Sequence, residues 1–269
     1  PLPLGSLPGG TRVGTLVHEL LEHTDFTAAD LAGAVADAAV AHGADRILEG
    51  RVDELVDGLV LALETPLGPG WDGRRLRDLR RVDRLDELGF DLPLAGGDHP
   101  TERLLTMAAI ADVFAGLPAD DPLAGYHERL ADPRLAASVR GFLNGSIDLV
   151  ARVGERYLVV DYKTNLLAPP GVAPTAWHYR PEAMAEAMAV AHYPLQAALY
   201  AVALHRFLRW RLPGYSPEAH LGGVGYLFLR GMSGPDTPVV DGAPCGVFGW
   251  FPPASFVIEL SDLLDRGVA

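Results

Sequence analysis

The sequence has little of what defines several protein classes. Its 269 residues include a single cysteine, Cys245, which excludes a disulfide framework and any cluster or zinc site built on several cysteines. No apolar run of about 18 residues suggests a membrane span. No charged-then-apolar leader opens the chain. These absences favour a cytoplasmic globular protein that does not contact a membrane.

Positive charge is also scarce. The chain has 22 Lys and Arg against 35 Asp and Glu, a formal net charge of −13. Because a free-standing nucleic-acid binder is usually basic, this balance counts against tight DNA binding by the chain alone. It still allows a site in which metal ions offset the acids, or a partner that delivers the substrate.

Two motifs of other enzyme classes are missing. The sequence contains no Gly-x-Ser-x-Gly elbow and no glycine-rich phosphate-binding loop. A hydrolase of small molecules therefore has little support.

The pattern of apolar residues predicts one α/β domain. Residues 1–12 have the composition of a linker remnant and lack a Met, so we expect a fragment of a larger protein. We expect residues 13–135 to be a mainly helical N-terminal part, with a strand within 82–94 and a helix over 99–117 that starts at Pro100.

Residues 136–269 are expected to be the catalytic α/β core. This part should contain a β-rich stretch at 140–161, helix at 182–212 interrupted near Pro194, a buried strand within 222–232, a loop with at most one short hairpin at 236–253, and a final helix. The order predicts a central mixed β-sheet flanked by helices.

A predicted hairpin brings two acids together. A turn centred on Gly154-Glu155 pairs Leu149 with Val160, and Asp148 then faces Asp161. Opposed residues have Cβ atoms about 4.5–5.5 Å apart, so the two carboxylates would repel each other. We expect a divalent cation between them, and oxygen ligands suit magnesium or manganese.

Lys163 follows Asp161 by two residues, so both side chains leave the same face of the strand. An ammonium there can orient a water nucleophile or stabilise charge on a phosphate oxygen. Such a site is what metal-assisted phosphodiester hydrolysis requires. The alternative is a surface hairpin with scattered charge, because Asp-x-Lys alone is a weak signal. The apolar composition of both strands favours the buried site.

Four further residues have two interpretations each. HELLEH, which begins at His18, lacks the second histidine of a zinc protease, and that interpretation is rejected. His18 is then either a half-buried structural histidine or a nitrogen ligand of the same metal. Gln196 and Tyr200 share a helix face as a packing pair or as neighbours of Lys163 or the DNA backbone. Glu87 alone reads as a surface acid.

Several segments together resemble a known family. GTLVHELLE, ELGFDLP, GSIDLV, VVDYKTN and YPLQAALYAVAL, in that order, resemble the RecB-type nuclease branch of the PD-(D/E)xK superfamily. GYLFLRGM resembles the strand that follows them in the nuclease domain of the RecBCD helicase–nuclease. The resemblance runs from about residue 11 to the end, and the combination is specific although each segment alone is not.

The resemblance implies a role for each candidate residue. The implied metal ligands are the side chains of His18, Asp148 and Asp161 and the backbone carbonyl of Tyr162. Lys163 would be the catalytic lysine, and Glu87 would lie near the metal as a further candidate ligand. Gln196 and Tyr200 match the Gln-x-x-x-Tyr motif of the family.

The resemblance also implies an activity. The chain would be a magnesium-dependent DNA nuclease similar to exodeoxyribonuclease V, and manganese could replace magnesium. Cleavage would leave a 5′-phosphate and a 3′-hydroxyl. Its substrate would be single-stranded DNA from a helicase on the same polypeptide, beside RecC- and RecD-like subunits, in double-strand-break processing and recombinational repair. An iron–sulfur cluster, present in some relatives, is not expected with Cys245 alone. The alternative is a catalytically silent nuclease-fold module for DNA binding or subunit assembly.

Overall fold

The structure is a computed structural model that describes residues 2–95, 104–135 and 138–268. Its α-helices are α1 (Thr11–His23), α2 (Leu31–Ala41), α3 (Ala44–Leu48), α4 (Val52–Glu64), α5 (Met107–Ala115), α6 (Tyr126–Leu130), α7 (Pro181–Val190), α8 (Tyr193–Arg211), α9 (Pro217–His220) and α10 (Ala254–Arg266). Its strands are β1 (Arg84–Leu94), β2 (Leu105–Thr106), β3 (Ser138–Val139), β4 (Gly141–Val153), β5 (Arg156–Lys163), β6 (Leu221–Phe228), β7 (Val239–Val240), β8 (Ala243–Pro244) and β9 (Val247–Trp250).

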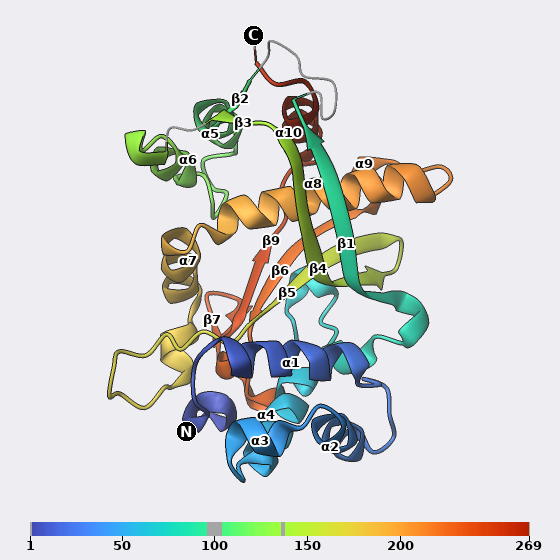
Figure 1. Cartoon of the computed structure of the whole chain (residues 1–269), viewed down its shortest axis with the longest axis vertical. Helices are drawn as coiled ribbons and strands as arrows, with labels where there is room; N and C mark the ends of the chain where they lie inside the picture. Colours follow the sequence, from blue (N-terminus) through green and yellow to red (C-terminus); the bar gives the residue numbers. More distant parts are fainter. Residues whose placement is uncertain (1, 96–103, 136–137, 269) are drawn as a thin grey trace.

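A central mixed sheet organises the domain, as predicted. Its strand order is β1-β4-β5-β6-β9, and only the β5–β6 pair is parallel (Figure 1). The parallel pair is possible because α7 and α8 form the crossover between the two strands. β1 comes from the part predicted to be mainly helical, so the sheet draws on both predicted parts of the chain.

The sheet separates two apolar cores. Val160 and Tyr162 of β5 pack in the core formed with α1 to α4, whereas Val159 packs in the core formed with α5, α8 and α10. Since side chains alternate along a strand, Asp161 and Lys163 share the face of Val159. The two charged residues therefore lie on the side of the sheet that α8 covers.

The β4–β5 hairpin has the predicted register. Leu149 pairs with Val160, and the pairs continue to the turn, where Gly154 has φ 62°. Glycine adopts this left-handed conformation without steric cost. One step beyond the Leu149–Val160 pair come Asp148 and Asp161, so the turn alone fixes their proximity.

The segment before α1, predicted to be a linker, packs on the domain. Leu4 and Leu7 are buried in the same core as α1. Gly58 of α4 leaves the room for Leu4, because a Cβ at Gly58 would lie only 2.2 Å from Leu4 Cδ2. The glycine inside this helix thus permits the close approach of the segment.

A buried arginine joins the same segment to the end of β5. Arg230 is 2% exposed and donates hydrogen bonds to the carbonyls of Leu4 (2.7 Å), Leu7 (2.8 Å) and Pro8 (2.7 Å). Its Nε donates to the carbonyl of Thr164 (2.8 Å), the residue after Lys163. Four carbonyls thus accept hydrogen bonds from this guanidinium, which has five N–H groups.

One helix differs in detail from the prediction. α5 begins at Met107 rather than near Pro100, because Leu105 pairs with Val139 and the Thr106 hydroxyl caps the helix by accepting from the Ala109 amide (3.2 Å). The predicted start lies outside the described residues.

The predicted interruption near Pro194 is confirmed. α7 and α8 are separate helices with an 86° bend between them. Pro194 stands in the first turn of α8, where its missing N–H removes no helical hydrogen bond. In the described part of the chain, no single helix combines the length and apolar character of a membrane span. Within the same residues, only α7 and α8 taken together have that length and apolar character, and they are bent relative to each other.

Candidate metal and catalytic site

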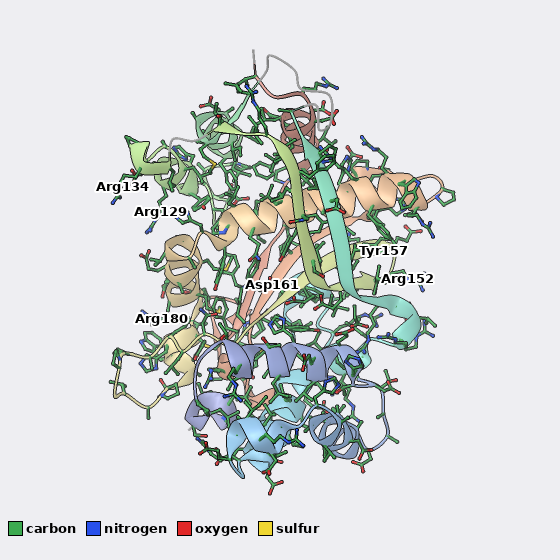
Figure 2. The ribbon with its side chains drawn as sticks, in the orientation of Figure 1. Arg129, Arg134, Arg152, Tyr157, Asp161 and Arg180 are labelled. Carbon is green, nitrogen blue, oxygen red and sulfur yellow. The ribbon has the colours of Figure 1, made fainter. Side chains whose placement is uncertain are left out.

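Two acids stand side by side where the hairpin passes between the helical layers. Asp148 lies on β4, and its Oδ2 accepts a hydrogen bond from the Tyr162 amide (2.7 Å). Asp161 lies on β5 and is 2% exposed. Figure 2 shows Asp161 near the centre of the molecule and Tyr157 towards the other end of the same strand. Asp161 is therefore in the interior, and Asp148 is half-buried.

Asp161 is paired with Lys163 but is not fully satisfied. Lys163 Nζ lies 2.6 Å from Asp161 Oδ2 as an ion pair. The contact lacks hydrogen-bond geometry, and Oδ2 has no hydrogen-bond partner within the described residues. Burial raises the pKa of Asp161 to about 7, with Lys163 lowering it and Asp148 raising it further. One ammonium thus stabilises the ionised form of Asp161, while burial and the nearby charge of Asp148 act against that form.

His18 reaches the same place from α1. Its Nε2 lies 3.0 Å from the Tyr162 carbonyl, which can only accept, and its Nδ1 lies 3.3 Å from Asp148 Oδ1. Burial lowers the pKa of His18, but the hydrogen bond to Asp148 and the charges of Asp148 and Asp161 outweigh it, so the pKa is raised. His18, Asp148 and the Tyr162 carbonyl, all predicted ligands, thus converge.

Glu87 is exposed but lies close to His18 and Asp148. The β1–β4 register places it opposite Asp148, and its φ of 49° is unusual for a residue with a Cβ. Its Oε2 accepts a hydrogen bond from the Ser146 hydroxyl (2.7 Å). Ligand atoms of His18, Glu87 and Asp148 all lie within 4.8 Å of one another. The strained conformation is typical of functional positions.

This donor set fits a hard divalent cation such as magnesium or manganese. It offers carboxylate oxygens, one backbone carbonyl and one imidazole nitrogen. Asp161 Oδ2 is buried and lies 2.6 Å from the Lys163 ammonium, so a divalent cation bound there would share this carboxylate with the lysine. Asp161 stands outside the three-residue group, because its carboxylate is turned to Lys163.

Gln196 and Tyr200 lie on one face of α8 beside the lysine. Lys163 Nζ donates to Gln196 Oε1 at 3.4 Å, and Gln196 Nε2 donates to the Tyr200 hydroxyl at 2.9 Å. Tyr200 therefore acts on the lysine only through Gln196. Burial raises the pKa of Tyr200, with a further rise from Asp161 and Asp148, so its hydroxyl stays protonated.

Two tyrosines at the site were missed by sequence reasoning. Lys163, the only lysine of the chain, has its Nζ 4.0 Å from the ring centre of Tyr193 and 5.1 Å from that of Tyr226. Tyr226 lies inside a strand that reads as uniformly apolar core, and Tyr193 reads as an ordinary helix start. Both fall in the segments that carry the family resemblance, which was the one signal available.

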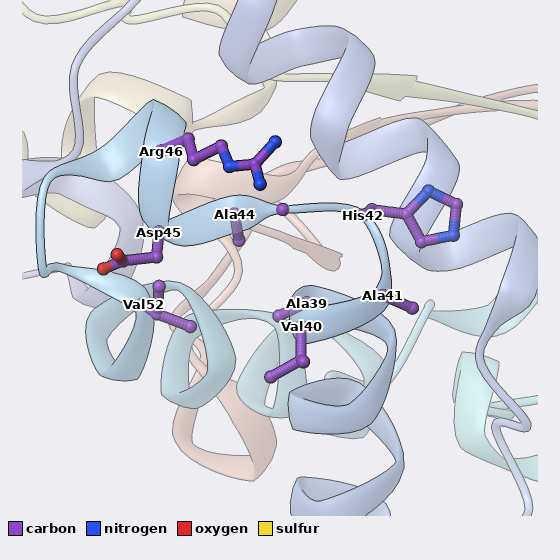
Figure 3. Close-up of a pocket in the computed structure, with 9 residues that line it drawn as sticks. Ala39, Val40, Ala41, His42, Ala44, Asp45, Arg46 and Val52 are labelled. Atoms are coloured by element: carbon purple, nitrogen blue, oxygen red, sulfur yellow. The ribbon is translucent and has the colours of Figure 1, made fainter.

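A separate hollow lies away from this site, around the turn between α2 and α3 (Figure 3). Its lining consists mostly of alanine and valine, with the polar side chains of His42, Asp45 and Arg46. None of its residues belongs to the group around Asp161, so it adds nothing to the chemistry described above.

Known proteins match the chain over nearly its whole length. A profile described as the PD-(D/E)XK nuclease superfamily matches residues 7–244. The "RecBCD enzyme subunit RecB" of Mycolicibacterium smegmatis is 49% identical over 267 residues, which cover 98% of this chain and 25% of that protein. That of Mycobacterium tuberculosis H37Rv is 48% identical over 98% of this chain and 24% of its own length.

The subunit of the same name from Escherichia coli is 34% identical over 225 residues, 84% of this chain and 17% of that protein. The chain thus spans a quarter or less of the length of these three relatives.

Proposed function

Because this chain belongs to the PD-(D/E)XK nuclease superfamily and matches a RecB nuclease domain, we propose that it is a divalent-metal-dependent deoxyribonuclease. It hydrolyses phosphodiester bonds, mainly of single-stranded DNA, and leaves a 5′-phosphate and a 3′-hydroxyl. The observation that carries the proposal is the buried Asp161, with the half-buried Asp148 near it, beside the chain's only lysine.

The residues that would hold magnesium, or manganese in its place, are His18, Asp148, Asp161 and the Tyr162 carbonyl, with Glu87 as a neighbour able to add an oxygen. A divalent ion there would supply a more acidic water and offset the charge on the phosphate.

The other residues set the geometry. The Tyr162 amide fixes one oxygen of Asp148 and leaves the other towards His18. The Lys163 ammonium orients water and stabilises charge that builds on a phosphate oxygen. Gln196 fixes the direction of that ammonium.

We further propose that the strand is delivered by a helicase portion of a longer polypeptide, beside RecC- and RecD-like subunits, in the cytoplasm during double-strand-break processing and recombinational repair. Support comes from relatives that are RecB subunits and from the quarter of their length that the chain spans. Delivery by a motor also accounts for a nuclease with a net charge of −13.

The test is cleavage of single-stranded DNA in magnesium, manganese, calcium and EDTA. The variant is Asp161→Ala, and the matched control is Glu155→Ala, an exposed acid in the turn of the same hairpin. We expect the parent and the control to cut with magnesium or manganese and the variant to lose this activity. Cleavage by Asp161→Ala at the parental rate contradicts the proposal.

The same assay distinguishes the alternative of a silent module. If the chain and the complete helicase-containing complex bind single-stranded DNA but neither cuts it with magnesium, DNA binding or subunit assembly is the better interpretation.

A further inference from the structure

The ammonium of Lys163 faces two stacked aromatic rings. Its Nζ is 4.0 Å from the ring centre of Tyr193 and 5.1 Å from that of Tyr226. The two rings have centres 5.7 Å apart and planes inclined by 23°. Tyr193 is the first residue of α8, and Tyr226 lies on β6 beside Asp161. The rings therefore come together only when the crossover helix is packed on the sheet.

Hydrogen bonds keep the rings in place. The Tyr226 hydroxyl donates to Gln196 Oε1 at 2.9 Å and lies 3.3 Å from the Tyr193 carbonyl. Tyr226 is 1% exposed, and burial raises its pKa well above the usual value, so the hydroxyl keeps its proton. Gln196, which accepts from Lys163 and from Tyr226, joins the ring of Tyr226 to the lysine it faces.

Lys163 needs a support that is independent of its acid. A lysine side chain is flexible and loses much rotamer freedom when it is fixed. Its partner Asp161 is also one of the residues proposed to hold the metal, so when that carboxylate turns away the ammonium is left with the long hydrogen bond to Gln196 (3.4 Å) and the two rings. The face of an aromatic ring attracts an ammonium, most strongly when water is excluded, but unlike Asp161 it is not a ligand for the divalent metal. The Lys163 side chain is only 13% exposed.

We propose that Tyr193 and Tyr226 are positioning residues whose ring faces hold the Lys163 ammonium at the reacting phosphate. The consequence for catalysis rests on the proposed nuclease function, whereas the position of the lysine can be measured without any cleavage. Tyr193→Phe keeps a ring and should keep the activity. Tyr193→Leu should lower kcat about tenfold with little change in KM, because the ammonium acts on transition-state charge.

The single lysine gives a direct measurement. A tag-free chain labelled with ¹³C-lysine shows one set of lysine signals, which report Lys163 alone. Because a ring face shields nearby protons, we expect its ε-methylene signal upfield of free lysine in metal-free buffer. Tyr193→Phe should retain that shift and Tyr193→Leu should lose much of it. The matched control, Tyr157→Leu, removes a half-buried tyrosine on the same strand and should retain the shift.

Asp161→Asn separates the rings from the ion pair. If the rings hold the ammonium, the upfield shift survives this substitution; if the ion pair holds it, the shift disappears and the proposal is overturned. Tyr226→Leu should reduce the shift as Tyr193→Leu does, and Tyr193→Leu decides alone if the buried Tyr226 variant does not fold.

Two further results would overturn the proposal: a parental lysine signal at the position of free lysine, or a parental kcat in Tyr193→Leu. Failure of the nuclease function looks different. In that case the shifts follow the ring substitutions as expected, while neither the parent nor any variant cuts DNA.

Discussion

Replacing Asp161 by asparagine should stabilise the metal-free chain at alkaline pH. The side chain is almost fully buried, and burial raises its pKa from 3.8 to about 7 against the opposing charge of Lys163. At pH 8 the native state therefore holds an ionised carboxylate in an environment that favours the neutral form. Asparagine keeps the shape of the neutral acid and removes the charge.

The size of the effect follows from the shift. The folded pKa of about 7 less the ordinary 3.8 is a rise of about 3 units, worth up to about 4 kcal/mol at about 1.4 kcal/mol per unit. Because the folded pKa lies above the unfolded one, the native state binds more protons between about pH 4 and 7. The unfolding free energy of the parent therefore falls as pH rises through that window, opposite to the usual carboxylate.

The assay is urea unfolding in EDTA at intervals from pH 4 to 8. The unfolding free energy of Asp161→Asn less that of the parent should be near zero at pH 4 and reach a plateau above pH 7. Glu155→Gln, an exposed acid of the same hairpin, should show no such rise. A difference that does not depend on pH, or that is largest at pH 4, refutes the reasoning. Added magnesium should stabilise the parent and not the variant.

Three further predictions follow from the same contacts. Measured by NMR in EDTA, the His18 imidazole should titrate with a midpoint above pH 6.5, and Asp148→Asn should lower that midpoint; an unchanged midpoint contradicts the prediction. The contribution of protonated His18 to stability is present below pH 6.5 and is lost as pH rises through the folded pKa. Arg230→Met should lower the free energy of unfolding in urea by about 3 kcal/mol, because it leaves four carbonyls without their donor. Deleting residues 1–8 should lower the free energy of unfolding less in this variant than in the parent. Glu87→Gln should weaken manganese binding in calorimetry while Glu155→Gln does not, and equal affinities would remove Glu87 from the site.

The hairpin could be predicted from local rules. A glycine turn fixes the register, and the register places Asp148 beside Asp161 without knowledge of the rest of the fold. Alternation then puts Lys163 on the same face. These rules act over a few residues, which is why sequence alone was sufficient here.

The partners from other elements required the family resemblance. Helical periodicity places His18 on the flank of an apolar stripe but does not say which strand that flank meets. In the same way it pairs Gln196 with Tyr200 without locating Lys163 beside them. The left-handed conformation of Glu87 has no sequence signal, since most residues with that φ are glycine.

Long-range packing accounts for what was not predicted. β9 is four residues long and becomes a strand by pairing with β6, so its sequence reads as loop. Tyr193 and Tyr226 come together where the crossover helix packs on the sheet, and nothing in either segment alone indicates a lysine against both rings.

The buried guanidinium of Arg230 has a mechanical consequence. It connects the carbonyls of the segment that enters the domain with the carbonyl of Thr164, one residue beyond Lys163. A tension applied to the chain at Leu2 would therefore be carried to the end of β5 as well as along the backbone to α1. A load on the segment before α1 therefore reaches the strand that holds Asp161 and Lys163 through one side chain.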